Sequence, residues 1–179
     1  MLRRKAYADF LNWKQTKDKE CLFVKGARQI GKTYLIRAFG QNEYETFIEI
    51  NFLKNPSLKD VFDGELDAKE IYKRISAHLP GINFIEGRTL IFLDEIQKCA
   101  KARMALKFLA EDNRCDVICS GSLLGLHYGQ DDDKEVEEVE SVPVGYERSL
   151  MMYSLDFTEF LWAYACSLWN ADKTCRADR

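Results

Sequence analysis

The sequence predicts a three-layer α/β fold in which helices cover both faces of a five-stranded, mostly parallel sheet. Segments with the apolar pattern of strands alternate along the chain with segments of helical periodicity. The strand-like segments are apolar on both faces, which is typical of parallel strands buried between two layers of helices. A chain of 179 residues with 46% hydrophobic residues is long enough and apolar enough to form its own core.

In the first part of the chain, helical stripes and short apolar runs alternate from the start. Ala6, Phe10 and Trp13 lie at helical spacing, and the run CLFVKG is typical of a buried strand that ends in a turn. The expected elements are a helix over 3–19, a strand over 21–26, a helix from Lys32 that ends at Gly40, and a strand over 46–52.

The same alternation continues in the second part of the chain. Pro80 and Gly81 end a well-formed helix, and the Asp156 carboxylate can cap the turn that holds Glu159. The expected elements are helices over 65–79 and 101–112, strands over 89–96, 116–122 and 150–155, and a final helix from Asp156.

Residues 26–33, GARQIGKT, match the phosphate-loop (Walker A) pattern G-x-x-x-x-G-K-[ST] without a mismatch, between an expected strand and an expected helix. Gly26 and Gly31 allow successive backbone N–H groups to turn toward a phosphate, and the start of the helix adds unpaired donors. The pattern therefore predicts a P-loop NTPase fold. The residues expected to contact the nucleotide are Gly26, Ala27, Arg28, Gln29, Ile30, Gly31, Lys32, Thr33 and Tyr34.

Four side chains are expected to act on the phosphates. Lys32 supplies a positive charge to the β and γ phosphates, and the Thr33 hydroxyl is a magnesium ligand. Asp94, at the end of the apolar strand TLIFLDEI (Walker B), is the second magnesium ligand. Glu95 follows it and is expected to orient a water for attack on the γ phosphate, as the catalytic acid of the pair.

The strand DVICSGS has a small polar end, which makes it a candidate sensor of the γ phosphate. In P-loop ATPases that hydrolyse with water, a strand of this kind lies between two others. One is the strand before the phosphate loop (the loop strand, here 21–26), and the other is the strand that carries the acid pair (the acid strand, here 89–96). Ser120 is the first candidate for the sensing, catalytic hydroxyl, and Ser122 is the second. A Ser-Gly-Ser turn that serves only backbone hydrogen bonding is the alternative.

Four segments, KGARQIGKTYLI, TLIFLDEIQKC, DVICSGSLLG and SVPVGYERSLMMYSLDFTEFLWA, resemble in order the blocks of a family of prokaryotic ATPases in the AAA+ superfamily, AAA domain family 14. The resemblance implies the five-stranded AAA+ sheet order, ATP as the nucleotide and a bacterial or archaeal cytosol. Carried over by position, it assigns phosphate binding to 26–33, magnesium to Asp94, the catalytic acid to Glu95 and the sensor strand to Ser120.

The resemblance also implies a domain organisation. It predicts an AAA+-like ATPase domain over 1–165, with an N-terminal helix within 1–19, a solvated acidic loop over 130–140 and an unassigned tail over 166–179. Family members usually carry a second domain after this core, so the chain is expected to be truncated and the partner-binding role to belong to the missing domain.

AAA+ enzymes generally complete the site with an arginine from a neighbouring subunit. Arg148, in GYERSL, is the candidate for that role and hence for self-association; a surface ion pair with Glu147 or with the acidic loop is the alternative.

The leading hypothesis is a domain that binds ATP and hydrolyses it with Mg²⁺. A truncated module that binds ATP with little turnover is the alternative, and a small-molecule kinase is a third hypothesis. Residues 1–40 carry ten Lys/Arg against three Asp/Glu in a chain of net charge −3, which favours a local anion site over a broad nucleic-acid surface.

No apolar run approaches the ~20 residues of a membrane helix, and no signal-peptide pattern opens the chain. The six cysteines form no C-x-x-C pair, which favours free thiols in a reducing cytoplasm over a metal–thiolate site.

Overall fold

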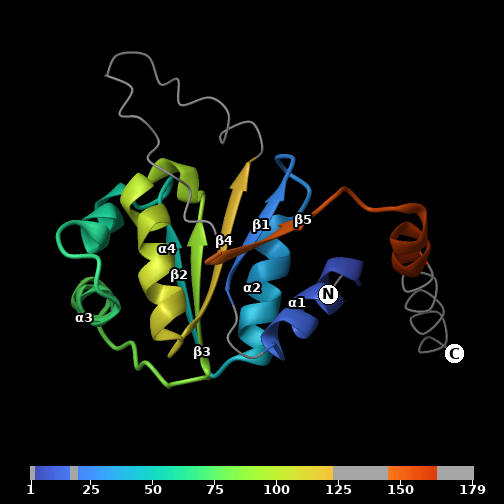
Figure 1. The fold of residues 1–179 in the computed structure, drawn as a ribbon. Helices are drawn as coiled ribbons and strands as arrows, with labels where there is room; N and C mark the ends of the chain where they lie inside the picture. The colour runs from blue at the N-terminus through green and yellow to red at the C-terminus, as the bar shows by residue number, and fades with distance from the viewer. Residues whose placement is uncertain (1–2, 17–19, 123–144, 165–179) are drawn as a thin grey trace, which may run out of the picture.

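The computed structural model of the chain describes residues 3–16, 20–122 and 145–164. In this part of the chain, five strands form one sheet in the order β2-β3-β4-β1-β5 (Figure 1). Every neighbouring pair is parallel, so the sheet is more uniform than the mostly parallel one predicted from the sequence. The strands are β1 (Cys21–Gly26), β2 (Thr46–Asn51), β3 (Thr89–Asp94), β4 (Asp116–Ser122) and β5 (Glu147–Met151).

Helices cover both faces of this sheet and complete the predicted three layers (Figure 1). Helices α1 (Lys5–Lys14) and α2 (Lys32–Glu43) pack on one face. The opposite face is covered by α3 (Ala68–His78), α4 (Ala100–Asp112) and the short 3₁₀ helices η1 (Pro56–Phe62) and η2 (Ile96–Lys98).

The side chains of β3 build a separate hydrophobic core on each face. Leu90 and Phe92 point into the core that contains Phe39 of α2, whereas Ile91 and Leu93 point into the core of α3 and α4. All six residues of β3 are buried. This explains why the strand reads as one continuous apolar run: a parallel strand between two helical layers has no face in contact with water.

The sheet order places the carboxyl ends of the site-bearing strands next to one another. β4 lies between β3 and β1, which is the strand position expected from the sequence. In the register of the sheet, Gly26 pairs with Ser122 and Asn51 pairs with Asp94. Parallel strands end at a common edge, and ligands of open α/β sheets bind at that edge.

The predicted end of the second helix at Gly40 is wrong. α2 continues to Glu43, and the backbone becomes extended at Tyr44. A Cβ on Gly40 would meet the ring of Phe47 in β2. The glycine therefore allows α2 to lie close to the sheet and does not terminate the helix.

Three other predicted boundaries are corrected by local geometry. α1 spans Lys5–Lys14 within the predicted 3–19, of which 17–19 lie outside the described residues. α3 begins at Ala68, later than the predicted 65, because the Asp67 carboxylate accepts the Lys69 N–H at 3.0 Å and caps the helix there. β3 ends at Asp94 and not at 96.

The fifth strand was predicted over 150–155 but lies over Glu147–Met151, paired in parallel with β1. It is an edge strand, and Arg148, Ser149 and Met151 are exposed. An edge strand that is open to solvent has no continuous apolar run, so the hydrophobic pattern marks only its last residues.

The expected final helix follows β5 and is helical over 157–164, to the end of the described range. Its start has the reciprocal bonds of a capping box: the Glu159 N–H donates to Asp156 Oδ1 at 2.8 Å, and the Asp156 N–H donates to Glu159 Oε2 at 3.1 Å. In Figure 1 this helix lies to the right of the sheet, past the end of β5. Residues 130–140 and 166–179, which carry the predicted acidic loop and tail, lie outside the described residues.

Candidate functional site

The phosphate-loop segment joins β1 to α2, and the connecting residues 27–31 include two with positive φ. Gln29 has φ 63° and Gly31, immediately before α2, has φ 91°. At Gly26 a Cβ would meet the carbonyl group of Met152 and the side chain of Ile30. Glycine is therefore required at the two motif positions for different reasons. Gly31 adopts a left-handed conformation, and Gly26 leaves room for the chain that follows β5.

Lys32 begins α2 and lies with its ammonium inside the curve of the loop. It is buried, and its Nζ donates to the carbonyl oxygens of Gly26 at 3.0 Å and Ala27 at 2.6 Å. Burial lowers the pKa of this ammonium, and the negative charges of Glu95 and Asp94 oppose that shift. The charge is therefore held at the loop by backbone carbonyls, which a phosphate oxygen can replace as acceptor.

Asp94, at the end of β3, accepts hydrogen bonds from residues of one helix and two other strands. Its side chain is buried and accepts bonds from Thr33 Oγ1 at 3.3 Å, Asn51 Nδ2 at 2.7 Å and Ser120 Oγ. Three residues that the sequence singled out, Thr33, Asp94 and Ser120, are therefore in direct contact. A carboxylate beside a hydroxyl is a set of hard oxygen donors, and that chemistry fits Mg²⁺.

Glu95 turns the chain away from β3 and is partly exposed. It has φ 57°, a left-handed conformation that is rare outside glycine, and its Oε2 accepts a bond from Gln97 Nε2 at 2.5 Å. Within the described residues, Gln97 Oε1 is buried and has no hydrogen-bond partner. A Cβ on Gly121 would lie 3.1 Å from that oxygen, so the end of β4 leaves space for the amide that contacts Glu95.

Two residues of this site, Asn51 and Gln97, were not predicted from the sequence. Asn51 ends β2, and its Oδ1 accepts the backbone N–H groups of Leu53 at 3.1 Å and Lys54 at 2.8 Å. This turn fixes the amide so that its Nδ2 points at Asp94. A polar residue at the end of the run TFIEIN indicates the edge of the sheet. The nearby sequence does not show that Asp94 is its hydrogen-bond partner.

A cavity of about 440 Å³ adjoins the loop on the side of the N-terminal segment. It is lined by loop residues 29–31, by Arg4 and Tyr34, and by 154–155 after β5. This volume is within the range of small-ligand pockets in proteins, about 300–1,000 Å³. Of the predicted loop contacts, Gln29, Ile30, Gly31 and Tyr34 line the cavity, while Lys32 and Thr33 face the sheet edge.

The second sensor candidate, Ser122, ends β4 beside Gly26, and its buried hydroxyl has no partner among the described residues. Along the sheet, Arg148 lies four positions before the level of Ser122 and two before that of Ser120, and β1 separates its strand from β4. It pairs in register with Leu22 near the start of β1, four residues before Gly26, which is about 13 Å along a strand. The neighbouring Glu147 forms ion pairs with Lys25 at 3.6 Å and Arg103 at 3.2 Å.

The described cysteines have the properties of buried free thiols. Cys21, Cys99, Cys115 and Cys119 form no disulfide, and burial raises the pKa of each thiol, for Cys115 to about 11. In the described ranges, no three His, Cys, Asp or Glu side chains gather into a metal-holding cluster. The same ranges contain no helix with the length and hydropathy to cross a membrane.

Comparison with known proteins gives one family. The model of the AAA domain matches residues 18–161, which include the loop, the acid strand, β4 and β5. No curated protein matches the chain. The family match agrees with the all-parallel, three-layer sheet and with the loop at its carboxyl edge. The chain therefore belongs to the AAA domain family, and its fold is that of an AAA-type P-loop ATPase domain.

Proposed function

We propose that this domain binds ATP together with Mg²⁺ and hydrolyses the γ phosphate with a water that Glu95 orients. The observation that carries the proposal is the convergence of Lys32, Thr33, Asp94 and Ser120 at one edge of the sheet. They come from the start of one helix and the ends of two strands. A cation, two hydroxyls and a carboxylate at this spacing meet the requirements of a triphosphate and its metal.

The triphosphate would be bound by the loop. Backbone N–H groups at the start of α2 are donors with the positive end of the helix dipole behind them. The Lys32 ammonium would exchange its bonds to the Gly26 and Ala27 carbonyls for bonds to phosphate oxygens. The cavity beside residues 29–31 offers space for the nucleoside, and its position next to the loop supports a nucleotide over a free phosphate.

Thr33 and Asp94 would hold the metal, directly or through water. Mg²⁺ neutralises charge that develops on the phosphate oxygens. Asn51 keeps the Asp94 carboxylate in one orientation, and Ser120 contacts the same carboxylate from β4. Ser120 could then respond to the γ phosphate, because its strand lies between the loop strand and the acid strand.

Glu95 would accept a hydrogen bond from the attacking water and orient it. Its Oε2 accepts the bond from Gln97 Nε2 at 2.5 Å, so this contact orients the carboxylate and leaves Oε1 as the acceptor for a water. The same contact favours the second candidate function, in which the domain binds ATP with little turnover. In that case the bond from Gln97 would hold the carboxylate in an orientation that does not reach the water.

Two variants test the proposal by calorimetric titration with ATP and by phosphate release. Lys32→Ala should abolish ATP binding, because the loop loses the ammonium that would face the phosphates. Glu95→Gln should preserve binding and lower the release rate by about 10²-fold or more. Matched controls are Lys73→Ala and Glu70→Gln, which change the exposed ion pair on α3 and should alter neither measurement.

The outcomes separate the two candidate functions. Phosphate release at the parental rate from Glu95→Gln would contradict the role given to Glu95. ATP binding by the parent protein with no phosphate release would support the binding module, and Gln97→Ala would then test whether the contact with Glu95 is the cause.

A further inference from the structure

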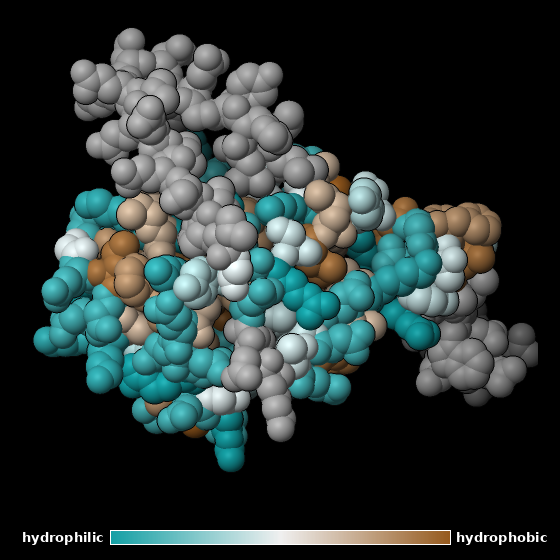
Figure 2. Space-filling model, in the orientation of Figure 1, coloured by the Kyte–Doolittle hydropathy of each residue, from teal (hydrophilic) through white to brown (hydrophobic). Residues whose placement is uncertain are grey.

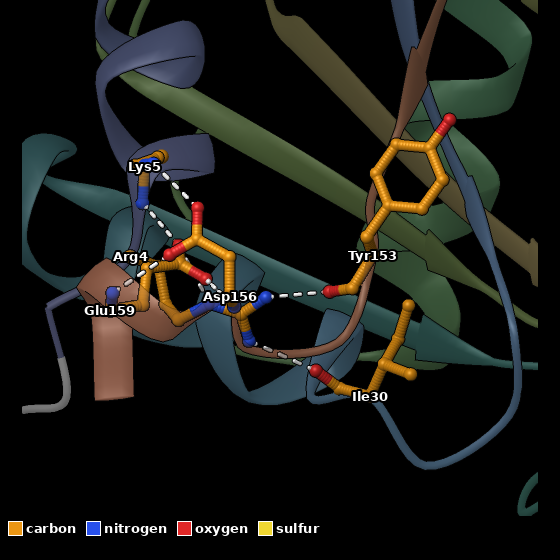
Figure 3. Close-up of polar contacts among 6 residues, drawn as sticks. All are labelled: Arg4, Lys5, Ile30, Tyr153, Asp156 and Glu159. Atoms are coloured by element: carbon orange, nitrogen blue, oxygen red, sulfur yellow. Dashed lines mark hydrogen bonds and ion pairs between the residues drawn. The ribbon is translucent and has the colours of Figure 1, made fainter. Parts of the chain in front are cut away.

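The Arg4 guanidinium joins three segments that are far apart in the sequence (Figure 3). Its Nη1 donates to the Ile30 carbonyl of the phosphate loop at 3.1 Å, and its Nη2 donates to the Tyr153 carbonyl at 2.7 Å. Its Nε donates to Glu159 Oε1 at 3.2 Å. The Arg4 side chain is 8% exposed, so these bonds form largely out of water.

Glu159 is the residue of helix 157–164 that accepts the hydrogen bond from Arg4. It is the one buried residue of that range, and its carboxylate also accepts the backbone N–H groups of Lys5 at 2.7 Å and Asp156 at 3.1 Å. Burial by itself would raise the pKa of this carboxyl, but the bonds from Lys5, Asp156 and Arg4 lower it below the usual value. Glu159 is therefore an ionised anchor between this helix and the N-terminal segment.

Beyond Glu159, helix 157–164 contacts the N-terminal segment through Trp162, whose ring lies under the Arg3 guanidinium at 4.2 Å, while most of its apolar surface is exposed. Its large apolar side chains lie at i, i+3, i+4 and i+7 and are exposed: Phe157, Phe160, Leu161 and Tyr164. Figure 2 shows hydrophobic surface over this helix at the right of the view. A helix normally packs by its apolar stripe. Here the stripe faces outward, so the position of the helix depends on the polar contacts at its start and on the contact of Trp162 with Arg3.

We infer that Arg4 is a positioning residue that couples the phosphate loop to helix 157–164. The inference rests on the proposed function in one respect, that a nucleotide is the ligand of the loop. The cavity lies between the two coupled parts, with Ile30 on one wall and residues 154–155 on another. A ligand that orders these walls acts on both ends of the Arg4 contact, and such coupling works equally in both directions.

The reciprocal direction can be tested without any nucleotide, by amide hydrogen exchange. Glu159→Gln removes the charge that Arg4 binds. We expect about tenfold faster exchange at helix 157–164 and also at the start of α2, where the Leu35 N–H bonds to the Gly31 carbonyl at 3.0 Å. The second effect requires transmission, either through Arg4, which bonds to both Glu159 and Ile30, or along the chain after β5, where the Met152 N–H bonds to the Lys25 carbonyl. The Arg4→Lys variant separates these two connections.

Two further variants make this readout specific. Lys5→Ala removes the exposed Lys5–Asp156 ion pair at the same helix start but keeps the Lys5 backbone N–H, so exchange at α2 should not change. Arg4→Lys keeps a charge but offers a single nitrogen, so it should raise exchange at both places and make Glu159→Gln without further effect on α2. Unchanged exchange over α3 verifies that each variant is folded.

The forward direction uses ATP with Mg²⁺ as the probe. In the parent protein, ATP should slow exchange at helix 157–164, and in Arg4→Lys this slowing should be lost while calorimetry still measures ATP binding. Coupling is overturned if Glu159→Gln alters the helix alone, if it alters neither place, or if Arg4→Lys keeps the response to ATP. A protein that binds no ATP would contradict the proposed function, while the nucleotide-free measurement would still decide the coupling.

Discussion

Within the site, single residues have roles that their neighbours in the fold define. Asn51 is the clearest case, because its side-chain amide oxygen and nitrogen form hydrogen bonds with different parts of the fold. Its oxygen closes a turn on the backbone of Leu53 and Lys54, and its nitrogen donates to Asp94. The orientation of the carboxylate that we propose as a metal ligand then depends on a residue that would touch neither metal nor nucleotide.

Replacement of Asn51 should therefore weaken the use of magnesium more than the binding of nucleotide. In Asn51→Ala we expect the Mg²⁺ concentration needed for half-maximal phosphate release to rise about 10- to 100-fold, the range seen when partners of metal ligands are removed. ATP binding measured without Mg²⁺ should stay near the parental value. Asn12→Ala, at an exposed position on α1, is the control. An unchanged magnesium dependence would contradict the role of Asn51.

The left-handed conformation at Gly31 gives a second prediction at the scale of one residue. Gly31 and Gly81 have nearly equal φ values, 91° and 90°, and a Cβ would find space at both. Each change to alanine should therefore lower the free energy of unfolding by about 1–2 kcal/mol through backbone strain alone. Only Gly31→Ala should also weaken ATP binding, since only Gly31 shapes the phosphate loop.

Urea unfolding and calorimetry of the two alanine variants measure these effects side by side. Equal losses of ATP affinity in both would mean that global stability, and not loop geometry, sets the binding. A Gly31→Ala protein with parental affinity would mean that the left-handed turn is dispensable for the nucleotide.

At the scale of elements, the start of helix 157–164 responds to pH in a defined direction. The folded pKa of Glu159 lies below its ordinary value of 4.5, although burial alone would raise it. Its contribution to stability is therefore complete above the unfolded pKa and is lost as the pH falls through the lower folded pKa.

The measurement is the difference in unfolding free energy between the parent protein and Glu159→Gln. We expect the parent to be more stable at pH 7 and at pH 6, with no change between them, and the difference to shrink once the pH falls below about 4.5, the ordinary pKa of a glutamate. Asp156 is not involved in this comparison because both proteins retain it. A difference that grows on acidification would contradict this direction of the pH dependence.

The position of each element in the fold explains how well the local sequence pattern predicted its boundaries. β3 and β4 were predicted closely because both faces are buried and every residue contributes to the apolar run. β5 was predicted late because an edge strand exposes Arg148 and Ser149. Gly40 was misinterpreted as a helix end, because the sequence gives no information about Phe47, whose ring explains the missing side chain.

At the scale of the whole molecule, Arg148 and the phosphate loop lie at opposite ends of β1 and its neighbour β5. An arginine at that distance does not reach the loop of its own chain. If Arg148 completes a catalytic site, the site belongs to another copy, and two copies must associate in the presence of ATP.

Mixing of inactive variants tests this arrangement. Arg148→Ala should keep ATP binding but lose most phosphate release, and a mixture with Glu95→Gln should recover part of the rate. In the mixture, a Glu95→Gln copy supplies the arginine to a neighbour that still has Glu95. Arg88→Ala, which removes an exposed ion pair with Glu45, is the control. No recovery on mixing, or a single-chain mass with ATP, would contradict the role in a neighbouring site.

The sequence by itself determined the alternation of strands and helices, the phosphate loop and the acid pair at the end of β3. These features are local: each depends on residues within about ten positions, through hydrophobic periodicity and the backbone needs of glycine. Only the tertiary structure decided that Asn51 contacts Asp94 and that Arg4 contacts Glu159. Those partners are 43 and 155 residues apart, and they meet because of the strand register and because the segment before α1 lies against the start of helix 157–164.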